Sequence, residues 1–241
     1  RWATIVSVAG GGLGWLVIAA GRAELLGTQP LELYSPETFG FLALLTFPHL
    51  LLARALLLLG LDAYLEAGRE SHAASRASVW LALLVLTQPL SLAAAVAAIG
   101  MHQLLGIARR VTRREGRPVE WGRVRPALVA LALPAALAAG YTLILRTDPF
   151  VRSWASQNIL LSPHPIHYAL AYGILLPAAM PAAWRALADQ LPDRLLLAGW
   201  AAVLPLLAYA PTVIQRRLPE GGWVALAILA ALGLSQLGVA P

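Results

Sequence analysis

The hydrophobic residues of this chain fall into long blocks that short polar stretches separate. An apolar block of about twenty residues is typical of a helix that crosses a bilayer, because a hydrocarbon core of about 30 Å needs that length at 1.5 Å per residue. The pattern therefore predicts an all-α fold, a polytopic transmembrane helical bundle with about seven to eight membrane segments. The expected segments cover residues 3–20, 39–61, 79–107, 127–145, 166–184, 195–211 and 223–238.

The block 79–107 is too long for one ordinary span, and Gln88-Pro89 interrupts it near the middle. Proline removes a helix hydrogen bond and clashes with the preceding turn, so the helix is expected to break there. Two arrangements stay open, a single kinked span and a hairpin with its tip at Gln88-Pro89. The hairpin is favoured, because it places more arginines on the same side as the arginine-rich segment 109–125.

Seven arginines lie in residues 109–125, between two apolar blocks. A dense basic segment between two spans is typical of a cytoplasmic loop, since arginine is hard to translocate. The alternative, a nucleic-acid patch, is disfavoured by the apolar flanks, and we expect no nucleic-acid partner. With this orientation four polar segments share the outer face: residues 21–38, 88–89, 146–165 and 212–222.

The composition supports a membrane protein and excludes several kinds of chemistry. The chain is 59% hydrophobic and 12% charged, whereas a soluble domain has about 25% charged residues. It has no cysteine, and arginine supplies all of its basic side chains, so disulfides, thiolate metal sites and lysine Schiff bases are excluded. Residues 1–241 are expected to form a single integral-membrane helical domain. Arg1 directly precedes an apolar run, and we expect the chain to be a piece of a longer protein.

The first outer segment carries a candidate catalytic carboxylate. Glu37 lies near Tyr34 and two further acids, and outer-face carboxylates can act as general bases or hold a divalent cation. Glu37 can equally be an ordinary solvated residue that complements a helix N-terminus. Deeper in the next block, His49 is expected to line a cavity or to be a hydrogen-bonded structural residue. Arg54 is expected either to snorkel toward the inner surface, which is favoured, or to pair within the bundle.

The segment 162–172 holds the densest polar cluster. If a helix begins at Pro165, a favoured first-turn position, then His164, His167 and Tyr168 crowd its start. The two histidines lack a third ligand of suitable spacing, so no metal site is expected. The cluster is predicted to be either part of a site or an interfacial belt.

Gln215, Arg216, Arg217 and Glu220 form the last candidate group. Two adjacent arginines on the outer face run against the charge bias, and the planar guanidinium matches phosphate oxygens in a bidentate manner. These residues are therefore expected to bind a lipid phosphate, with plain headgroup contact as the alternative. A membrane lipid is the expected partner.

Several of these stretches, in this order, resemble bacterial polytopic glycosyltransferases of the GT-C type. The resemblance rests on short motifs spread over most of the chain: Gly12–Trp15, Ser35–Phe39, Phe47–Leu50, the break at Gln88-Pro89, Ser162–Gly173 and Gln215–Gly221. It implies a multi-pass enzyme of the bacterial inner (plasma) membrane that moves a sugar from a polyprenyl-phosphate donor to an acceptor on the outer face. The family has a His-Pro where this chain has Gln88-Pro89.

The resemblance also implies roles for individual residues. Glu37 would be a second catalytic carboxylate, with the principal acid upstream of Arg1. The donor phosphate would be bound by Gln215, Arg216, Arg217 and Glu220, and the cavity would be lined by His49, Gln88, His164, His167 and Tyr168. Two alternatives remain: a transporter or lipid flippase, which would need an internal repeat and paired broken helices, and a non-catalytic lipid-binding subunit.

Overall fold

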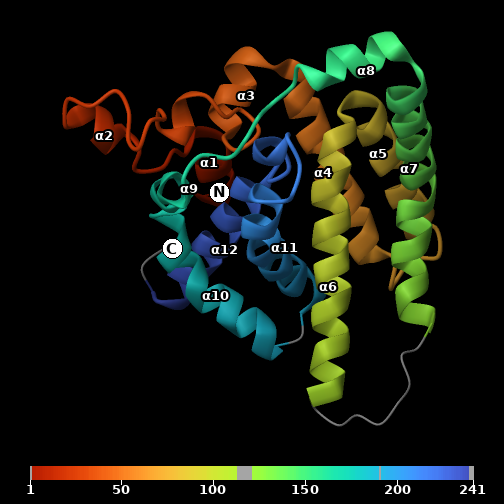
Figure 1. Ribbon diagram of the computed structural model, residues 1–241. Helices are drawn as coiled ribbons and strands as arrows, with labels where there is room; N and C mark the ends of the chain where they lie inside the picture. Colours follow the sequence, from red (N-terminus) through yellow and green to blue (C-terminus); the bar gives the residue numbers. More distant parts are fainter. Residues whose placement is uncertain (1, 113–120, 190, 239–241) are drawn as a thin grey trace.

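The computed structural model describes residues 2–112, 121–189 and 191–238, and this part of the chain is helical, with one isolated β-bridge and no strand. The all-α expectation is confirmed. The middle of the arginine-rich segment 109–125, residues 113–120, lies outside the described residues. The structure is a helical bundle in two groups (Figure 1).

Four helices form the first group, and they run alternately up and down in Figure 1. They are α4 (Pro48–Glu66), α5 (Ala73–Thr87), α6 (Leu92–Thr112) and α7 (Trp121–Thr147). The second group packs beside α6 through α11. It comprises α1 (Trp2–Ala9), α9 (Pro165–Tyr172), α10 (Leu175–Asp189), α11 (Pro192–Ala208) and α12 (Gly222–Gln236).

Short elements connect the long helices. These are α2 (Trp15–Ala19), α3 (Gly40–Thr46), α8 (Pro149–Ser156) and three 3-10 turns, η1 (Leu31–Leu33), η2 (Pro89–Ser91) and η3 (Gln215–Arg217). In Figure 1 α3, α8, η2 and η3 gather at the upper end of the molecule. The polar segments assigned to the outer face therefore lie together at that end, which is called the loop end below.

The expected number of membrane segments is wrong. Three helices of the described chain are long and apolar enough to cross a bilayer: Pro48–Glu66, Pro89–Val111 and Val124–Thr147. A fourth span results if the bent pair Pro165–Tyr172 and Leu175–Ala188 is one crossing. The described chain therefore has three to four candidate membrane-spanning helices rather than the expected seven to eight.

Other apolar blocks that were expected to span the membrane do not form long enough helices, for different physical reasons. The block 3–20 splits at its glycine run into α1 and α2, because the backbone of α9 approaches there: Leu13 N donates to Leu170 O at 2.9 Å. At 15 residues, α12 spans about 22 Å, and most of its side chains are buried inside the protein. A helix that is apolar on every side can be a protein core as well as a membrane span.

The break at Gln88-Pro89 is confirmed. Helix α5 ends at Thr87, Gln88 has an extended backbone, and Pro89 begins η2. Figure 1 shows the chain turning back at η2, so that α5 and α6 run in opposite directions. The hairpin is therefore the arrangement in the structure.

A second break, which the sequence did not reveal, separates α9 from α10. The two helices are bent by 79° at Gly173. A Cβ at Gly173 would lie 2.6 Å from the carbonyl oxygen of Ala169, so glycine fits this sharp bend and a larger residue does not. The predicted helix start at Pro165 is confirmed.

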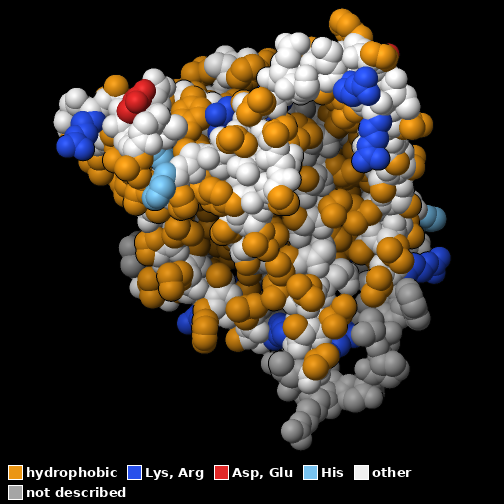
Figure 2. All heavy atoms as spheres, viewed as in Figure 1, with side chains coloured by type: hydrophobic (Ala, Val, Ile, Leu, Met, Phe, Trp, Pro, Cys, Tyr) orange, Lys and Arg blue, Asp and Glu red, His pale blue; other side chains and the backbone are white. Residues whose placement is uncertain are grey.

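The exposed surface is strongly apolar. Hydrophobic side chains cover much of the face in Figure 2, and α7 buries few of its residues although it is the most hydropathic of the three long helices. Side chains such as Leu128, Leu143 and Ile144 remain more than half exposed. Such a surface is typical of contact with lipid rather than water.

Candidate functional site

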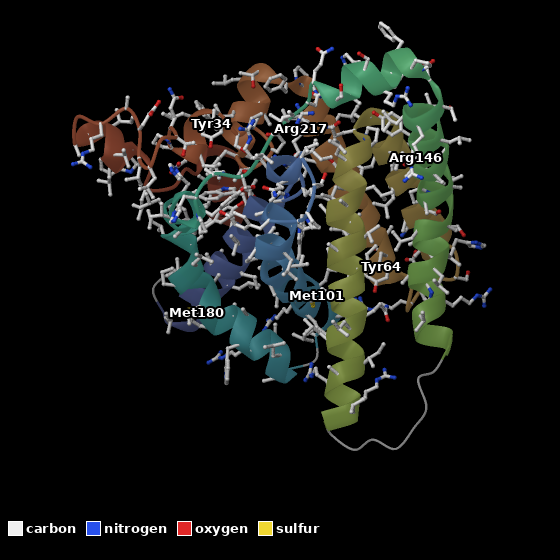
Figure 3. The ribbon with its side chains drawn as sticks, in the orientation of Figure 1. Tyr34, Tyr64, Met101, Arg146, Met180 and Arg217 are labelled. Atoms are coloured by element: carbon white, nitrogen blue, oxygen red, sulfur yellow. The ribbon has the colours of Figure 1, made fainter. Side chains whose placement is uncertain are left out.

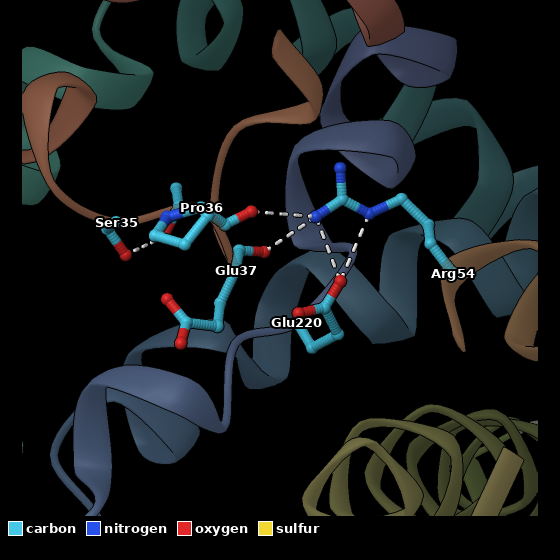
Figure 4. A network of polar contacts seen from close by, with 6 residues as sticks. Ser35, Pro36, Glu37, Arg54 and Glu220 are labelled. Atoms are coloured by element: carbon cyan, nitrogen blue, oxygen red, sulfur yellow. Dashed lines mark hydrogen bonds and ion pairs between the residues drawn. The ribbon is translucent and has the colours of Figure 1, made fainter. Parts of the chain in front are cut away.

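The centre of the loop end is a buried arginine on α4. Arg54 donates from Nε and Nη2 to Glu220 Oε1, at 3.1 and 2.8 Å (Figure 4). Its Nη2 also donates to the carbonyl oxygens of Pro36 and Glu37, at 3.2 and 3.0 Å. The expectation that Arg54 snorkels to the surface is wrong, because only 5% of the residue is exposed. A buried guanidinium needs such partners to offset its desolvation.

Glu220 is placed by the tight turn that leads into α12. Gly221 has a φ of +72° and a Cβ there would lie 2.9 Å from the Trp200 ring, so this position requires glycine. The turn buries the Glu220 carboxylate almost completely. Burial raises the pKa of Glu220 to about 7, and the neighbouring Arg54 opposes this by favouring the charged form.

Glu37 is held at both its main chain and its side chain. Its carbonyl oxygen accepts from Arg54, and its Oε1 lies 3.1 Å from Arg217 Nε. Glu37 is buried, while the side chain of Arg217 is one third exposed. The structure thus brings together Glu37 and Arg217, which the sequence places 180 residues apart.

Arg216 packs on an aromatic ring of the first outer segment. Its guanidinium carbon lies 4.7 Å from the centre of the Tyr34 ring, a cation–π contact. Burial raises the pKa of Tyr34, and Arg216 partly offsets this. Tyr34 and Arg217 lie at the same end of the protein in Figure 3.

These charged residues, Glu37, Arg54, Arg216, Arg217 and Glu220, are called the arginine–carboxylate cluster below. With all five ionised the cluster has three positive and two negative charges and a net charge of +1. Five buried side-chain atoms of the cluster lack a hydrogen-bond partner within the described chain: Glu37 Oε2, Glu220 Oε2, Arg54 Nη1, Arg216 Nε and Arg217 Nε, the last of which makes only the ion pair with Glu37. A net positive cluster with unused donors and acceptors can bind an anion that also carries a hydroxyl group.

Gln215 belongs to the support of the cluster rather than to its charged centre. Its Oε1 accepts from Ser162 N at 3.1 Å, and Ser162 Oγ lies 3.0 Å from the hydroxyl of Tyr168. A backbone hydrogen bond also joins the two segments: Arg216 N donates to Leu160 O at 3.1 Å. These bonds fasten η3 to the segment before α9.

The remaining predicted site residues lie elsewhere. Buried His167 places Nε2 2.8 Å from both Leu25 O and Thr28 Oγ1 and so holds the first outer segment against α9. Exposed His164 caps α9 through its Nδ1. His49 is exposed and contacts Phe47, and Gln88 caps α5. The structure gives none of these four a contact with the charged centre.

For Arg54 the sequence favoured snorkelling, and the structure shows the other alternative, pairing within the bundle. Its signal was an ionisable side chain within an apolar block, which in membrane proteins usually faces the bundle interior. No group of three or more potential metal-ligating residues (His, Asp, Glu) occurs in the part of the chain that the structure describes.

Comparison with known proteins gives no relatives: no family model, no curated protein and no solved structure matches the chain.

Proposed function

We propose that this chain belongs to a bacterial inner-membrane glycosyltransferase that moves a sugar from a polyprenyl-phosphate donor to an acceptor on the outer face. The observation that carries the proposal is the arrangement of Glu37. One carboxylate oxygen lies against Arg217 and the other has no partner. A base and two arginines therefore stand side by side at the loop end of an apolar bundle, where a lipid-linked phosphate would lie.

The proposed chemistry is a displacement at the anomeric carbon. The acceptor hydroxyl oxygen bonds to that carbon, the bond from the carbon to the phosphate oxygen breaks, and the hydroxyl proton passes to Glu37 Oε2. The departing polyprenyl phosphate gains negative charge, which Arg216 and Arg217 stabilise. A divalent cation could assist at the phosphate, although the described residues offer no ready three-ligand group for it.

The test is sugar transfer in liposomes by the full chain and by an Arg216→Ala, Arg217→Ala double variant. Each charge-assisted hydrogen bond contributes about 1.5–3 kcal/mol, so transfer should fall at least about 100-fold while expression stays intact. The matched control is Arg146→Ala with Arg152→Ala, which removes two arginines in or next to the exposed helix α8. Unchanged transfer in the first variant would exclude the phosphate role.

A second candidate function, transport of a lipid-linked substrate, is favoured by one observation. The bend at Gly173 breaks one apolar helical segment of the described chain, and transporters place substrates at broken helices. The same liposomes distinguish the functions: a transporter moves labelled lipid between leaflets without transferring sugar. Lipid binding with neither activity would indicate the non-catalytic subunit.

A further inference from the structure

The segment that carries Glu37 is buried, and its backbone hydrogen bonds are local ones: Thr38 N and Phe39 N both donate to Ser35 O. Ser35 and Thr38 have no exposed surface, and their hydroxyl groups pair with each other at 3.0 Å. The carbonyl oxygens of Pro36 and Glu37 point instead to a single guanidinium nitrogen, Arg54 Nη2. The position of this segment therefore depends on a side chain of α4.

Arg54 is itself fixed from the opposite side. Glu220 binds two of its nitrogens through one oxygen, at 3.1 and 2.8 Å, so α4, the Glu37 segment and the turn before α12 meet at one guanidinium (Figure 4). Lysine could not replace it, because an ammonium group is a point charge without the planar fork that spans a carboxylate and two carbonyls.

The guanidinium of Arg54 lies against the backbone at Gly40, where a side chain would not fit. A Cβ at Gly40 would lie 3.3 Å from Arg54 Nη1 and 2.6 Å from the carbonyl oxygen of Ser7. The start of α3 is therefore closely packed around the guanidinium, which restricts its orientation.

We infer that Arg54 is a positioning residue: it fixes the backbone at Pro36 and Glu37 so that Glu37 Oε1 meets Arg217 and Oε2 is left without a partner in the protein. In this proposal Arg54 acts through Glu37 and is assigned no contact with the sugar donor or the acceptor. Its catalytic consequence rests on the proposed function, whereas its effect on the segment does not.

The chain has no cysteine, so a single introduced thiol reports on one position. In the Ser35→Cys variant the thiol is buried next to Thr38, and a maleimide should label it slowly. Adding Arg54→Lys should speed labelling at least about ten-fold, because local opening exposes the segment. The matched control is Ser78→Cys, a buried position on α5, whose labelling rate should stay unchanged.

Kinetics then test the consequence for catalysis. Arg54→Lys should lower kcat for sugar transfer about ten-fold or more through misplacement of the base, and it should leave KM for the donor unchanged. Arg217→Gln, which removes a proposed phosphate contact, should raise that KM instead.

The outcomes separate the positioning role of Arg54 from the proposed sugar transfer. Unchanged labelling at Ser35→Cys overturns the positioning role, and so does equal acceleration at Ser78→Cys, because Arg54 would then support the whole fold. A rise in KM without a fall in kcat also overturns it. Faster labelling at Ser35→Cys alone, in a protein whose wild type transfers no sugar, supports the positioning role and refutes the proposed function.

Discussion

Two sets of arginine–glutamate ion pairs in this protein have similar chemistry and opposite surroundings. Arg54 and Glu220 are 166 residues apart, and their side chains are 7% and 1% exposed. Arg76 on α5 pairs with Glu66 at the end of α4 and with Glu70 in the connection between the two helices, and its side chain is 44% exposed. Exposed ion pairs contribute about 0–1 kcal/mol, whereas breaking a buried pair costs about 3–5 kcal/mol. The buried pair is therefore the one expected to determine the structure of the loop end.

The largest effect should follow from removing one buried partner. Arg54→Gln leaves Glu220 without its cation, and we expect the free energy of unfolding in detergent to fall by about 3–5 kcal/mol. Arg54→Gln combined with Glu220→Gln should restore part of this loss, since no buried charge is left unpaired. A decrease below about 1 kcal/mol in the single variant would make the two sets equivalent and contradict the comparison.

The pH dependence of stability should also come from the buried pair. The pKa of Glu220 is raised to about 7 by burial from an ordinary value of about 4.5, so between these values the folded state binds more protons than the unfolded state. The contribution of Glu220 to the free energy of unfolding is then fully present below about pH 4.5. This contribution is lost as the pH rises to about 7, by up to about 1.4 kcal/mol per pH unit. Thermal unfolding at a series of pH values measures this slope.

Glu220→Gln should remove this contribution, whereas Glu66→Gln at the exposed pair should keep the wild-type slope. A slope that persists in Glu220→Gln would assign the titration to another group.

An intermediate effect on stability is expected when alanine replaces the glycine beside the buried pair, but not when it replaces the glycine beside the exposed pairs. Gly40→Ala brings a methyl group within 2.6 Å of Ser7 O, next to Arg54, and overpacking of this kind costs about 1–3 kcal/mol. Gly68, in the turn near Arg76, has no atom within 4 Å of its Cβ position, so Gly68→Ala should change stability by less than about 0.5 kcal/mol. Equal melting temperatures for both variants would show that the surroundings of Arg54 can relax.

The smallest effect belongs to the exposed pair. Arg76→Gln should lower the free energy of unfolding by less than about 1 kcal/mol, and 0.5 M salt should reduce the difference further because exposed charges are screened. Chemical denaturation at low and high salt measures both. A larger loss that is insensitive to salt would show that Arg76 acts through packing.

Helix periodicity and proline chemistry explain why part of the fold was predictable. The helix start at Pro165 and the break at Gln88-Pro89 both follow from residues within a few positions of the feature. The bend at Gly173 was missed because a helix tolerates an isolated glycine, so the residue alone does not indicate a break.

The number of spans was not predictable for a related reason. Hydropathy reports removal from water and does not distinguish lipid from protein interior. Helices α7 and α12 are both strongly apolar, but α7 exposes most of its surface, whereas α12 is short and packs among α1, α10 and α11.

For the candidate site, the sequence identified the residue types but not the pairs they form. Glu37, Arg216, Arg217 and Glu220 were singled out, and the structure brings them to one end of the bundle. Four predicted cavity residues, His49, Gln88, His164 and His167, have other surroundings, and their cavity-lining role stays a prediction. Arg54 was misjudged, since a sequence does not reveal which partner a buried charge finds.

The sequence by itself determined that the chain is helical, that it has apolar helices of the kind that suit a membrane, where several helices start and break, and which polar segments share an end. These properties depend on composition and on neighbours a few residues apart. Tertiary structure alone decided which apolar helices form the core, and that Glu220 meets Arg54 while Glu37 meets Arg217. Contacts between residues 166 or more positions apart depend on how the helices pack, and no local pattern encodes that packing.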